Sequence, residues 1–373
     1  LKKKSCLTIV NRKNINFPKS RQIKVDNTLN FLTKCSSIFR ENINAKIISI
    51  TGSCGKTTLK EMIGLTLRKS SKITFSPKSF NNKYGVPLSL FNLKQNDEFG
   101  VFEVGMDKKG EIDYLTKIIK PDLGVITNIS YAHSKNFKTI NQIADAKAEI
   151  INNIKEKGIV VLNMDDHFYG YHENFAKRKK IKVISFSIHK KSSMIKLVKV
   201  KKFKDKYELF INVNGLSVSF YSRNDNKSNI YNILASLAVI NLYKDIRKFK
   251  KNIFLNFKIP SGRGDISKVK LKNKKIHLVD ETYNSNPLSL KIALENYDKI
   301  DSKDSKKFLI LGDMLELGKH SIKQHKLISK IVNQTKIDKV YVTGKYIKET
   351  FKGLNSIKKA EILDKNFNII DLI

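Results

Sequence analysis

The sequence predicts an α/β protein in which a central domain with a mostly parallel sheet is followed by a second, Rossmann-like α/β domain. Short apolar runs, each the length of a buried strand and bounded by Gly, Pro, Asn or Asp, recur along the 373 residues. Amphipathic helical patterns alternate with them, and this alternation is typical of a parallel sheet with helices on its faces. A stretch rich in turn residues, IPSGRGD, separates two alternating blocks, so we expect two such domains.

The central domain is predicted to cover residues 46–257. Its expected strands are KIISI, FGVFEVGM, DLGVITNI and KGIVVLNM, and its expected helices are TTLKEMIGLTLRK, GEIDYLTKIIK and INQIADAKAEIINNI. Period-two alternation around Asn214 and Gly215, in YELFINVNGLSVSFY, predicts a hairpin that extends the sheet in the antiparallel sense. A further helix is expected at NIYNILASLAVINLY.

The second domain is predicted to cover residues 258–373. Its expected strands are KKIHLVDE, KKFLILGDM and DKVYVTG, separated by helices at NPLSLKIALENY and HKLISKIVNQ. Residues 1–45 are weakly patterned and contain one expected helix, TLNFLTKCSSIF.

The charge balance is strongly basic, with 72 Lys and Arg against 34 Asp and Glu and a formal net charge of +38. Lysine is scattered along the whole chain, which is more typical of a composition bias than of a binding surface. An attraction for phosphate-bearing ligands or nucleic acid is the alternative, but no basic-aromatic stacking pattern supports a specific nucleic acid. Three cysteines without metal-ligand spacing argue for a reducing compartment, so the cytoplasm is expected. No apolar run approaches the ~18 residues of a membrane span.

The motif GSCGKTT follows a predicted strand and opens a predicted helix, which is the context of a phosphate-binding loop. Lys56 would reach the terminal phosphates of a nucleotide, and Thr57 can ligate a magnesium ion. The match to G-x-x-x-x-G-K-[ST] is imperfect because Ile50 stands where the first Gly would be. Cys54 is interpreted as a residue without a role of its own. The residues predicted to bind the nucleotide here are Gly52, Ser53, Gly55, Lys56, Thr57 and Thr58.

Two further candidates follow predicted strands. Glu103 has apolar neighbours on both sides, and a carboxylate there is costly to bury unless it is paired or bound to a cation. A satisfied core carboxylate and a metal ligand beside the phosphate loop both remain open. His133 alone would be an ordinary loop histidine. However, Thr57, Glu103 and His133 all lie at or near strand carboxyl ends, the edge where open α/β sheets bind ligands.

Lys147 lies on the apolar stripe of its predicted helix, four residues after Ile143 and three and four before Ile150 and Ile151. One interpretation is a lysine that snorkels from the edge of the stripe to solvent. The other is a lysine drawn into a site, where a lowered pKa would allow reaction with carbon dioxide to give an anionic carbamate.

Polar residues of the second block add weaker candidates. Arg263, in SGRGD, could reach a phosphate or lie in solvent. Asn284 and Asn286, in VDETYNSNP, could read a base or ribose, although turn formation before Pro287 explains them equally. The segments NMDDH and GDMLELG are further strand-end loops with carboxylates, and the first is interpreted as turn chemistry.

Taken together, these motifs resemble the Mur ligase family between Ile50 and Gly318. The segments that carry the resemblance are ITGSCGKTTLKE, SFNNKYGVPLSL, FEVGMDKKGEIDYL, TNISYAHSKNF, IADAKAEI, VLNMDDH, the pair Gly262-Arg263, DETYNSNP and LGDMLELG. The resemblance implies an ATP-dependent amide ligase built on a phosphate-loop ATPase domain. In that chemistry a peptide carboxylate attacks the γ-phosphate, and an amine then displaces phosphate from the acyl phosphate. Placement and charge neutralisation are what such phosphoryl transfer needs.

The resemblance also implies roles for individual residues. The implied catalytic residues are Lys56, Glu103, His133 and Lys147, and the implied magnesium ligands are Thr57, Glu103, His133 and a carbamylated Lys147. Nucleotide contacts are implied for Arg263, Asn284 and Asn286. The implied cofactors are ATP and Mg²⁺, and the implied substrates are a UDP-N-acetylmuramoyl tripeptide and D-alanyl-D-alanine. We expect a monomer without a specific nucleic-acid or membrane partner.

The chain departs from the family pattern in three places. Only some 45 residues precede the first sheet, so the family's N-terminal domain, which holds the UDP-sugar, is expected to be largely missing. The family's C-terminal domain runs further than Ile373, and Ser228 stands before Asn229 where the family usually has His. Three alternatives therefore remain: another amide ligase of this fold, such as a folylpolyglutamate synthase-like or diaminopimelate-adding enzyme; a phosphate-loop ATPase that binds nucleic acid; and an ATP-binding fragment without ligase activity.

Overall fold

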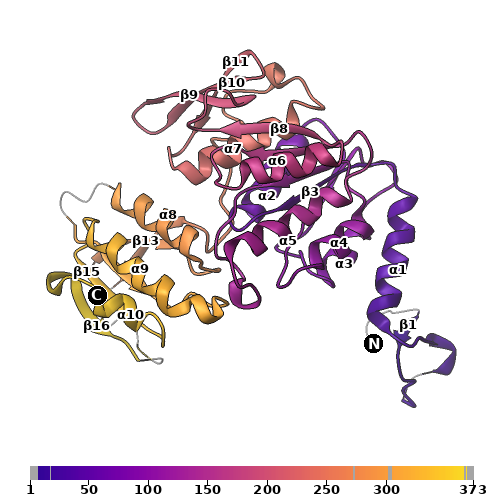
Figure 1. Cartoon of the computed structure of the whole chain (residues 1–373), viewed down its shortest axis with the longest axis horizontal. Coiled ribbons are helices and arrows are strands. Elements are labelled where there is room, and N and C mark those ends of the chain that lie inside the picture. Colours follow the sequence, from indigo (N-terminus) through magenta and orange to yellow (C-terminus); the bar gives the residue numbers. More distant parts are fainter. Residues whose placement is uncertain (1–6, 17, 272–273, 301–304, 365–366, 368–373) are drawn as a thin grey trace.

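The computed structural model describes residues 7–16, 18–271, 274–300, 305–364 and 367. Its largest element is a nine-stranded sheet in the order β11-β10-β9-β8-β7-β6-β3-β5-β4 (Figure 1). These strands are β3 (Lys46–Thr51), β4 (Ile73–Phe75), β5 (Phe99–Glu103), β6 (Leu123–Ile126), β7 (Ile159–Asn163), β8 (Lys182–Ser187), β9 (Ile195–Lys202), β10 (Tyr207–Val213) and β11 (Leu216–Ser222). Strands β3 to β9 pair in parallel with one another, whereas β10 is antiparallel to both of its neighbours, β9 and β11. The α/β fold and the hairpin at Asn214 and Gly215 are confirmed.

Helices cover both faces of this sheet because its central strands are apolar on both sides. In β3, Ile48 and Ile50 face one core while Ile47 faces the other, and all three are fully buried. The first core contains residues of α2 (Lys56–Leu67) and α7 (Lys227–Ile240). The second contains residues of α3 (Gly85–Leu90), α4 (Glu111–Ile119), α5 (Ile140–Asn152) and α6 (Tyr169–Arg178). The short helices η2 (Ser134–Asn136) and η3 (Ile246–Lys248) lie in connecting segments.

The segment before the central sheet forms a small unit of its own. Strands β1 (Thr8–Val10) and β2 (Gln22–Lys24) pair in parallel, with η1 (Lys19–Arg21) between them. The expected helix follows as α1 (Thr28–Glu41), capped by Asn27, whose side chain accepts a hydrogen bond from Asn30 N at 2.9 Å. This helix packs against α3 and α4.

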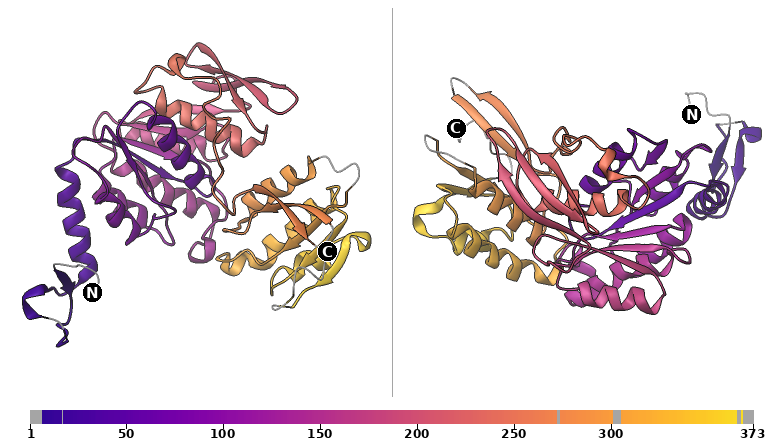
Figure 2. Two further views of the ribbon diagram at one scale, coloured as in Figure 1. Left: turned by 180° about the vertical axis from the view of Figure 1, so that it is seen from behind. Right: turned by 90° about the horizontal axis from the view of Figure 1, so that it is seen from above.

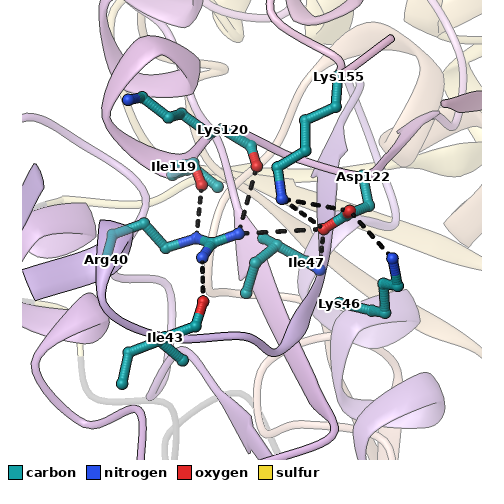
Figure 3. Close-up of polar contacts among 8 residues, drawn as sticks. All are labelled: Arg40, Ile43, Lys46, Ile47, Ile119, Lys120, Asp122 and Lys155. Atoms are coloured by element: carbon teal, nitrogen blue, oxygen red, sulfur yellow. Dashed lines mark hydrogen bonds and ion pairs between the residues drawn. The ribbon is translucent and has the colours of Figure 1, made fainter. Parts of the chain in front are cut away.

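A buried arginine fixes the end of α1 to the central sheet. Arg40 donates hydrogen bonds to the carbonyls of Ile119, Ile43 and Lys120, and its Nη2 lies 3.9 Å from Asp122 Oδ2 (Figure 3). Asp122 in turn accepts a hydrogen bond from Ile47 N at 2.8 Å. The beginnings of β3 and β6 are thereby joined to the end of α1.

The second block has its own core and lies beside the central sheet rather than continuing it (Figure 2). Its parallel sheet consists of β14 (Phe308–Leu311), β15 (Lys339–Val342) and β16 (Lys359–Ile362). Its helices are α8 (Pro287–Asp298), α9 (Ser321–Asn333), α10 (Lys348–Lys352), η4 (Gly318–His320) and η5 (Ser356–Lys358). Among the described residues no helix is long and apolar enough to cross a membrane.

One prediction for this block is wrong in its pairing. The segment KKIHLVDE forms a strand, β13 (Lys274–Asp280), but it pairs antiparallel with β12 (Asp265–Leu271) in a separate two-stranded sheet. The sequence analysis placed β13 in an alternating parallel block and did not predict β12. The alternation of lysine with aliphatic residues in β12 does not fit a buried parallel strand, and Ile266 and Val269 are exposed like Lys268 between them.

Candidate functional site

A glycine-containing loop joins β3 to α2, and its shape depends on two glycines. Gly52 has φ +142°, and a Cβ there would lie 1.8 Å from Thr127 Oγ1. Gly55 has φ +83°, and a Cβ there would lie 3.1 Å from Asn232 Oδ1. Both positions therefore exclude a side chain. Because no side chain caps the start of α2, its first backbone N–H groups and its positive dipole end are available to an anion.

The end of β6 holds this phosphate loop in place. Asn128 Oδ1 accepts a hydrogen bond from Cys54 N at 2.9 Å, and Thr127 Oγ1 donates to Cys54 O at 2.7 Å. Ser53 Oγ donates to Ser130 O at 3.0 Å and accepts from Ser130 N at 2.8 Å. These partners were missed by the sequence analysis, because segment TNIS carried a strand signal and no separate signal for loop contacts.

Lys56 and Thr57 take the places expected of them at the start of α2. Lys56 Nζ donates to Gly52 O at 2.8 Å, so the lysine folds back over its own loop. Thr57 Oγ1 donates to Glu103 Oε2 at 2.7 Å and lies 3.2 Å from Ser79 Oγ. Thr58 was also predicted to bind the nucleotide, but its side chain has no polar partner among the residues that the structure describes.

Glu103 ends β5 with its side chain next to the phosphate loop and only 2% exposed. Its Oε1 accepts a hydrogen bond from Asn81 Nδ2 at 2.7 Å, and its Oε2 accepts the one from Thr57. The carboxylate is thus satisfied by protein donors. The same group of Thr, Ser and Glu oxygens also fits Mg²⁺, which prefers hard oxygen ligands. Both interpretations of Glu103 therefore agree with its surroundings.

A second buried lysine shapes the loop that carries Ser79. Lys60 is fully buried and donates to the carbonyls of Ser76 and Lys78, each at 2.5 Å, and it pairs with Glu61 at 2.9 Å. It fixes the loop after β4 against α2. The sequence analysis missed Lys60, although its place four residues after Lys56, on the buried face of TTLKEMI, was a signal of the same kind as that of Lys147.

Lys147 is buried inside the protein with 2% of its surface exposed, so it does not snorkel to solvent. No hydrogen bond or ion pair to its amine is found among the described residues. Burial, and then the positive charge of Lys56, hold the pKa of Lys147 well below its usual value, while Cys54 opposes this shift. A buried amine with a lowered pKa therefore lies next to the phosphate loop.

His133 lies beyond β6 in the left-handed conformation, with φ +54°. The structure does not join it to Thr57 or Glu103; instead, its Nδ1 contacts Glu316 of the second block and lies 3.7 Å from Asp107 Oδ1. Burial lowers the pKa of His133, the charge of Lys56 lowers it further, and Glu316 opposes the shift. One ligand atom from each of Asp107, His133 and Glu316 lies within 4.8 Å of the others.

Two of the three candidates in the second block reach the phosphate-loop side. Asn286 caps α8 and its Nδ2 lies 3.2 Å from Cys54 Sγ. The guanidinium of Arg263 donates to Ser79 Oγ at 3.2 Å and lies 4.0 Å from the ring centre of Tyr283. Asn284 is exposed, and within the described part of the chain its side chain accepts a hydrogen bond only from the adjacent Ser285 N, so the structure does not bring it to the site.

The segment NMDDH does more than turn the chain. Asn163 Oδ1 accepts a hydrogen bond from Asp165 N at 3.0 Å, as turn chemistry predicts. Asp166 Oδ2 also accepts from Ile129 N at 2.8 Å, so it supports the loop that carries Asn128 and Ser130. Burial raises the pKa of Asp166.

Comparison with known proteins gives concordant results. The model of the Mur ligase middle domain matches residues 50–240. UDP-N-acetylmuramoyl-tripeptide–D-alanyl-D-alanine ligase of Buchnera aphidicola (subspecies Acyrthosiphon pisum) is 34% identical over 371 residues, covering 95% of this chain and 76% of that protein. The ligase of the same name from Bacillus subtilis is 30% identical, covering 87% of this chain and 68% of that protein.

Solved structures agree with these matches. A structure of MurF from Acinetobacter baumannii superposes with a TM-score of 0.85 at 25% identity, covering 95% of this chain and 75% of that one. A structure of the MurF ligase from Thermotoga maritima in complex with ADP has a TM-score of 0.82 at 26% identity, with coverages of 96% and 79%.

Proposed function

Because the chain belongs to the Mur ligase family, we propose that it uses ATP to join D-alanyl-D-alanine to a UDP-N-acetylmuramoyl tripeptide. The names of the curated relatives support this choice of substrates. One structural observation carries the proposal: a phosphate loop is flanked by the Thr57–Glu103 pair and by Lys147, a buried amine to which the described residues give no hydrogen bond. A buried amine without hydrogen bonds is costly in a simple ATP-binding fold, which favours a site with a further chemical role.

The first half of the reaction transfers the γ-phosphoryl group to the peptide carboxylate. In our proposal Lys56 leaves Gly52 O and binds the β- and γ-phosphates, while the N–H groups at the start of α2 bind the phosphate oxygens. Mg²⁺, when bound, would neutralise the charge that develops on these oxygens. Thr57 and Glu103 have the oxygen donors to hold it, and His133 is the further proposed ligand.

Lys147 is proposed to act as a carbamate. The neutral amine adds to carbon dioxide, an N–C bond forms and a proton is released, which leaves an anionic group on the side chain. Lys56 lies close enough for its charge to lower the pKa of Lys147, and the same charge would stabilise the anion. The carbamate would supply an anionic oxygen ligand beside Thr57 and Glu103.

The second half joins the amine of D-alanyl-D-alanine to the acyl phosphate and releases phosphate. Asn286 and Arg263 reach the phosphate-loop side from the second block, which supports a site completed by both blocks. We propose that Arg263 exchanges its bond to Ser79 for a phosphate oxygen, since a guanidinium suits this ligand. We further propose that the enzyme is a monomer and works in the cytoplasm, where ATP is made available.

The test is phosphate release and product formation with ATP, Mg²⁺ and D-alanyl-D-alanine, with and without the UDP-N-acetylmuramoyl tripeptide. We expect phosphate release only when every component is present, together with a product of the mass of the joined pentapeptide. Arms with glutamate and with diaminopimelate as the amine distinguish the other amide ligases of this fold. Release with one of those amines alone, or no substrate-dependent release at all, would overturn the proposal.

A further inference from the structure

Two loops from different blocks dock closely beside the candidate site. The loop of residues 131–137, after β6, meets the segment of residues 316–320, before α9. Lys135 N donates to Glu316 O at 2.7 Å, and His320 Nε2 lies 3.2 Å from Phe137 O. Gly318 permits this approach, because a Cβ at that position would lie 2.8 Å from Lys135 Cα.

His133 lies within this contact, and its two ring nitrogens have different surroundings. Nδ1 faces the carboxylate of Glu316, with Asp107 Oδ1 at 3.7 Å. Nε2 has no hydrogen-bond or ion-pair partner in the described part of the chain. Lys135 pairs with Asp107 at 3.2 Å, which fixes the histidine loop from the central block.

The ring has one nitrogen proton to place when it is neutral. A carboxylate at Nδ1 accepts that proton's hydrogen bond, which leaves the lone pair on Nε2. A metal-ligating histidine is usually oriented in this way, by a carboxylate or carbonyl on its other nitrogen.

We propose that Glu316 is a positioning residue: docked from the second block, it holds His133 through Nδ1 and leaves Nε2 as the ligand for a metal ion that binds with the nucleotide. This inference rests on the proposed function and deepens it, because it makes the metal ligand depend on the seating of the second block. Asp107 supports the same ring from the central block. If the two blocks separate, His133 loses the acceptor that sets its orientation.

The experiment measures the affinity of the whole chain for Mn²⁺ in the presence of ADP, by electron paramagnetic resonance of the free ion, so that no turnover is needed. Glu316→Ala should weaken Mn²⁺ binding about tenfold or more, the effect typical of removing such an outer partner. Glu316→Gln should recover part of this loss, because its amide oxygen can still accept from Nδ1. Glu295→Ala, an exposed carboxylate on α8 of the same block, is the matched control and should bind as the parent does.

A second variant, at Gly318, tests separately whether the docking of the two loops matters. Gly318→Ala should push the two loops apart and weaken Mn²⁺ binding by a similar factor, although Glu316 is intact. The double variant Glu316→Ala with Gly318→Ala should then be no worse than either single variant, since both act through one contact. ADP binding in EDTA should stay unchanged in all of them.

The outcomes test the positioning role of Glu316 separately from the proposed function. Parental Mn²⁺ affinity in Glu316→Ala, or additive losses in the double variant, would overturn the positioning role alone. A defect of Glu316→Ala that is equally large without ADP would mean that Asp107, His133 and Glu316 hold the cation themselves, which also overturns it. If the parent chain with ADP bound no Mn²⁺ at all, the proposed function would fail and this inference with it.

Discussion

Arg40 and Lys147 are both buried basic residues of the central block, but they lie at opposite edges of its sheet. Arg40, 3% exposed, lies where the strands begin and donates to three backbone carbonyls beside Asp122 (Figure 3). Lys147, 2% exposed, lies where the strands end and has no hydrogen-bond partner among the described residues. A buried cation whose hydrogen bonds go to backbone carbonyls maintains structure. A buried amine left without partners marks a site that awaits a ligand or a modification.

The largest effect on stability is expected at Arg40, at the edge of the sheet where the strands begin. Arg40→Met would leave the carbonyls of Ile119 and Ile43 without their donor and would weaken the pairing of Asp122. We expect the free energy of unfolding to fall by about 3–5 kcal/mol, the cost of removing one partner of a buried ionic network. Urea denaturation followed by circular dichroism measures this change.

The control for Arg40 lies in the same network. Lys155 Nζ is 3.3 Å from Asp122 Oδ1, but its side chain is largely exposed, so Lys155→Met should cost less than about 1 kcal/mol. Equal losses in the two variants would show that Arg40 acts as an ordinary surface charge, and the contrast between the two edges would disappear.

At Lys147, where the strands end, we expect a substitution to reduce turnover and to leave stability intact. Lys147→Met should lower kcat about 10²–10³-fold, the effect of losing one group that stabilises charge in the transition state. Its free energy of unfolding should stay the same or rise, because a buried amine that no described residue hydrogen-bonds is replaced by an apolar chain of similar length. Turnover and urea denaturation of the same preparation measure both quantities. A variant as active as its parent, or one destabilised as strongly as Arg40→Met, would make Lys147 a structural residue.

The elements that the sequence predicted best are those whose pattern has a single physical cause. Buried parallel strands read as continuous apolar runs, and β3, β5, β6 and β7 follow KIISI, FGVFE, LGVI and IVVLN. The hairpin followed from Asn214 and Gly215, whose positive φ values the turn requires. The ribbon β12–β13 was misplaced because alternating lysines resemble solvated loops in a chain with this much lysine.

The candidate site was predicted where residue type and position conflict. Glu103 and Lys147 stood out because a charged residue occupied a buried position in the pattern. Lys60 presented the same conflict but was overlooked among the many lysines of the chain. The contact of Glu316 with His133 could not be read from the sequence, because it depends on how the two blocks dock and no local periodicity encodes that.

A further buried base, on α6, extends the comparison to pH. His172, on α6, is 2% exposed, and its Nε2 lies 3.1 Å from Ala144 O of α5, the helix that carries Lys147. Burial lowers the pKa of His172 to about 4; the Ala144 carbonyl opposes the shift, Lys147 adds to it and Asp145 opposes it. Between pH 6.5 and pH 4 the unfolded chain therefore binds more protons at this position than the folded one, and stability falls as the pH is lowered.

The loss due to His172 should reach about 3 kcal/mol by pH 4, since each pKa unit corresponds to about 1.4 kcal/mol. The His172 ring has one carbonyl partner, which does not keep it charged in the folded state, whereas Arg40 has three. His172→Gln keeps a donor for Ala144 O but cannot be protonated, so its free energy of unfolding should fall less steeply between pH 6.5 and pH 4. Urea denaturation of both proteins across this range measures the difference. Parallel pH profiles would mean that His172 is charged in the folded protein, and that a buried cation in this block needs fewer partners than Arg40 has.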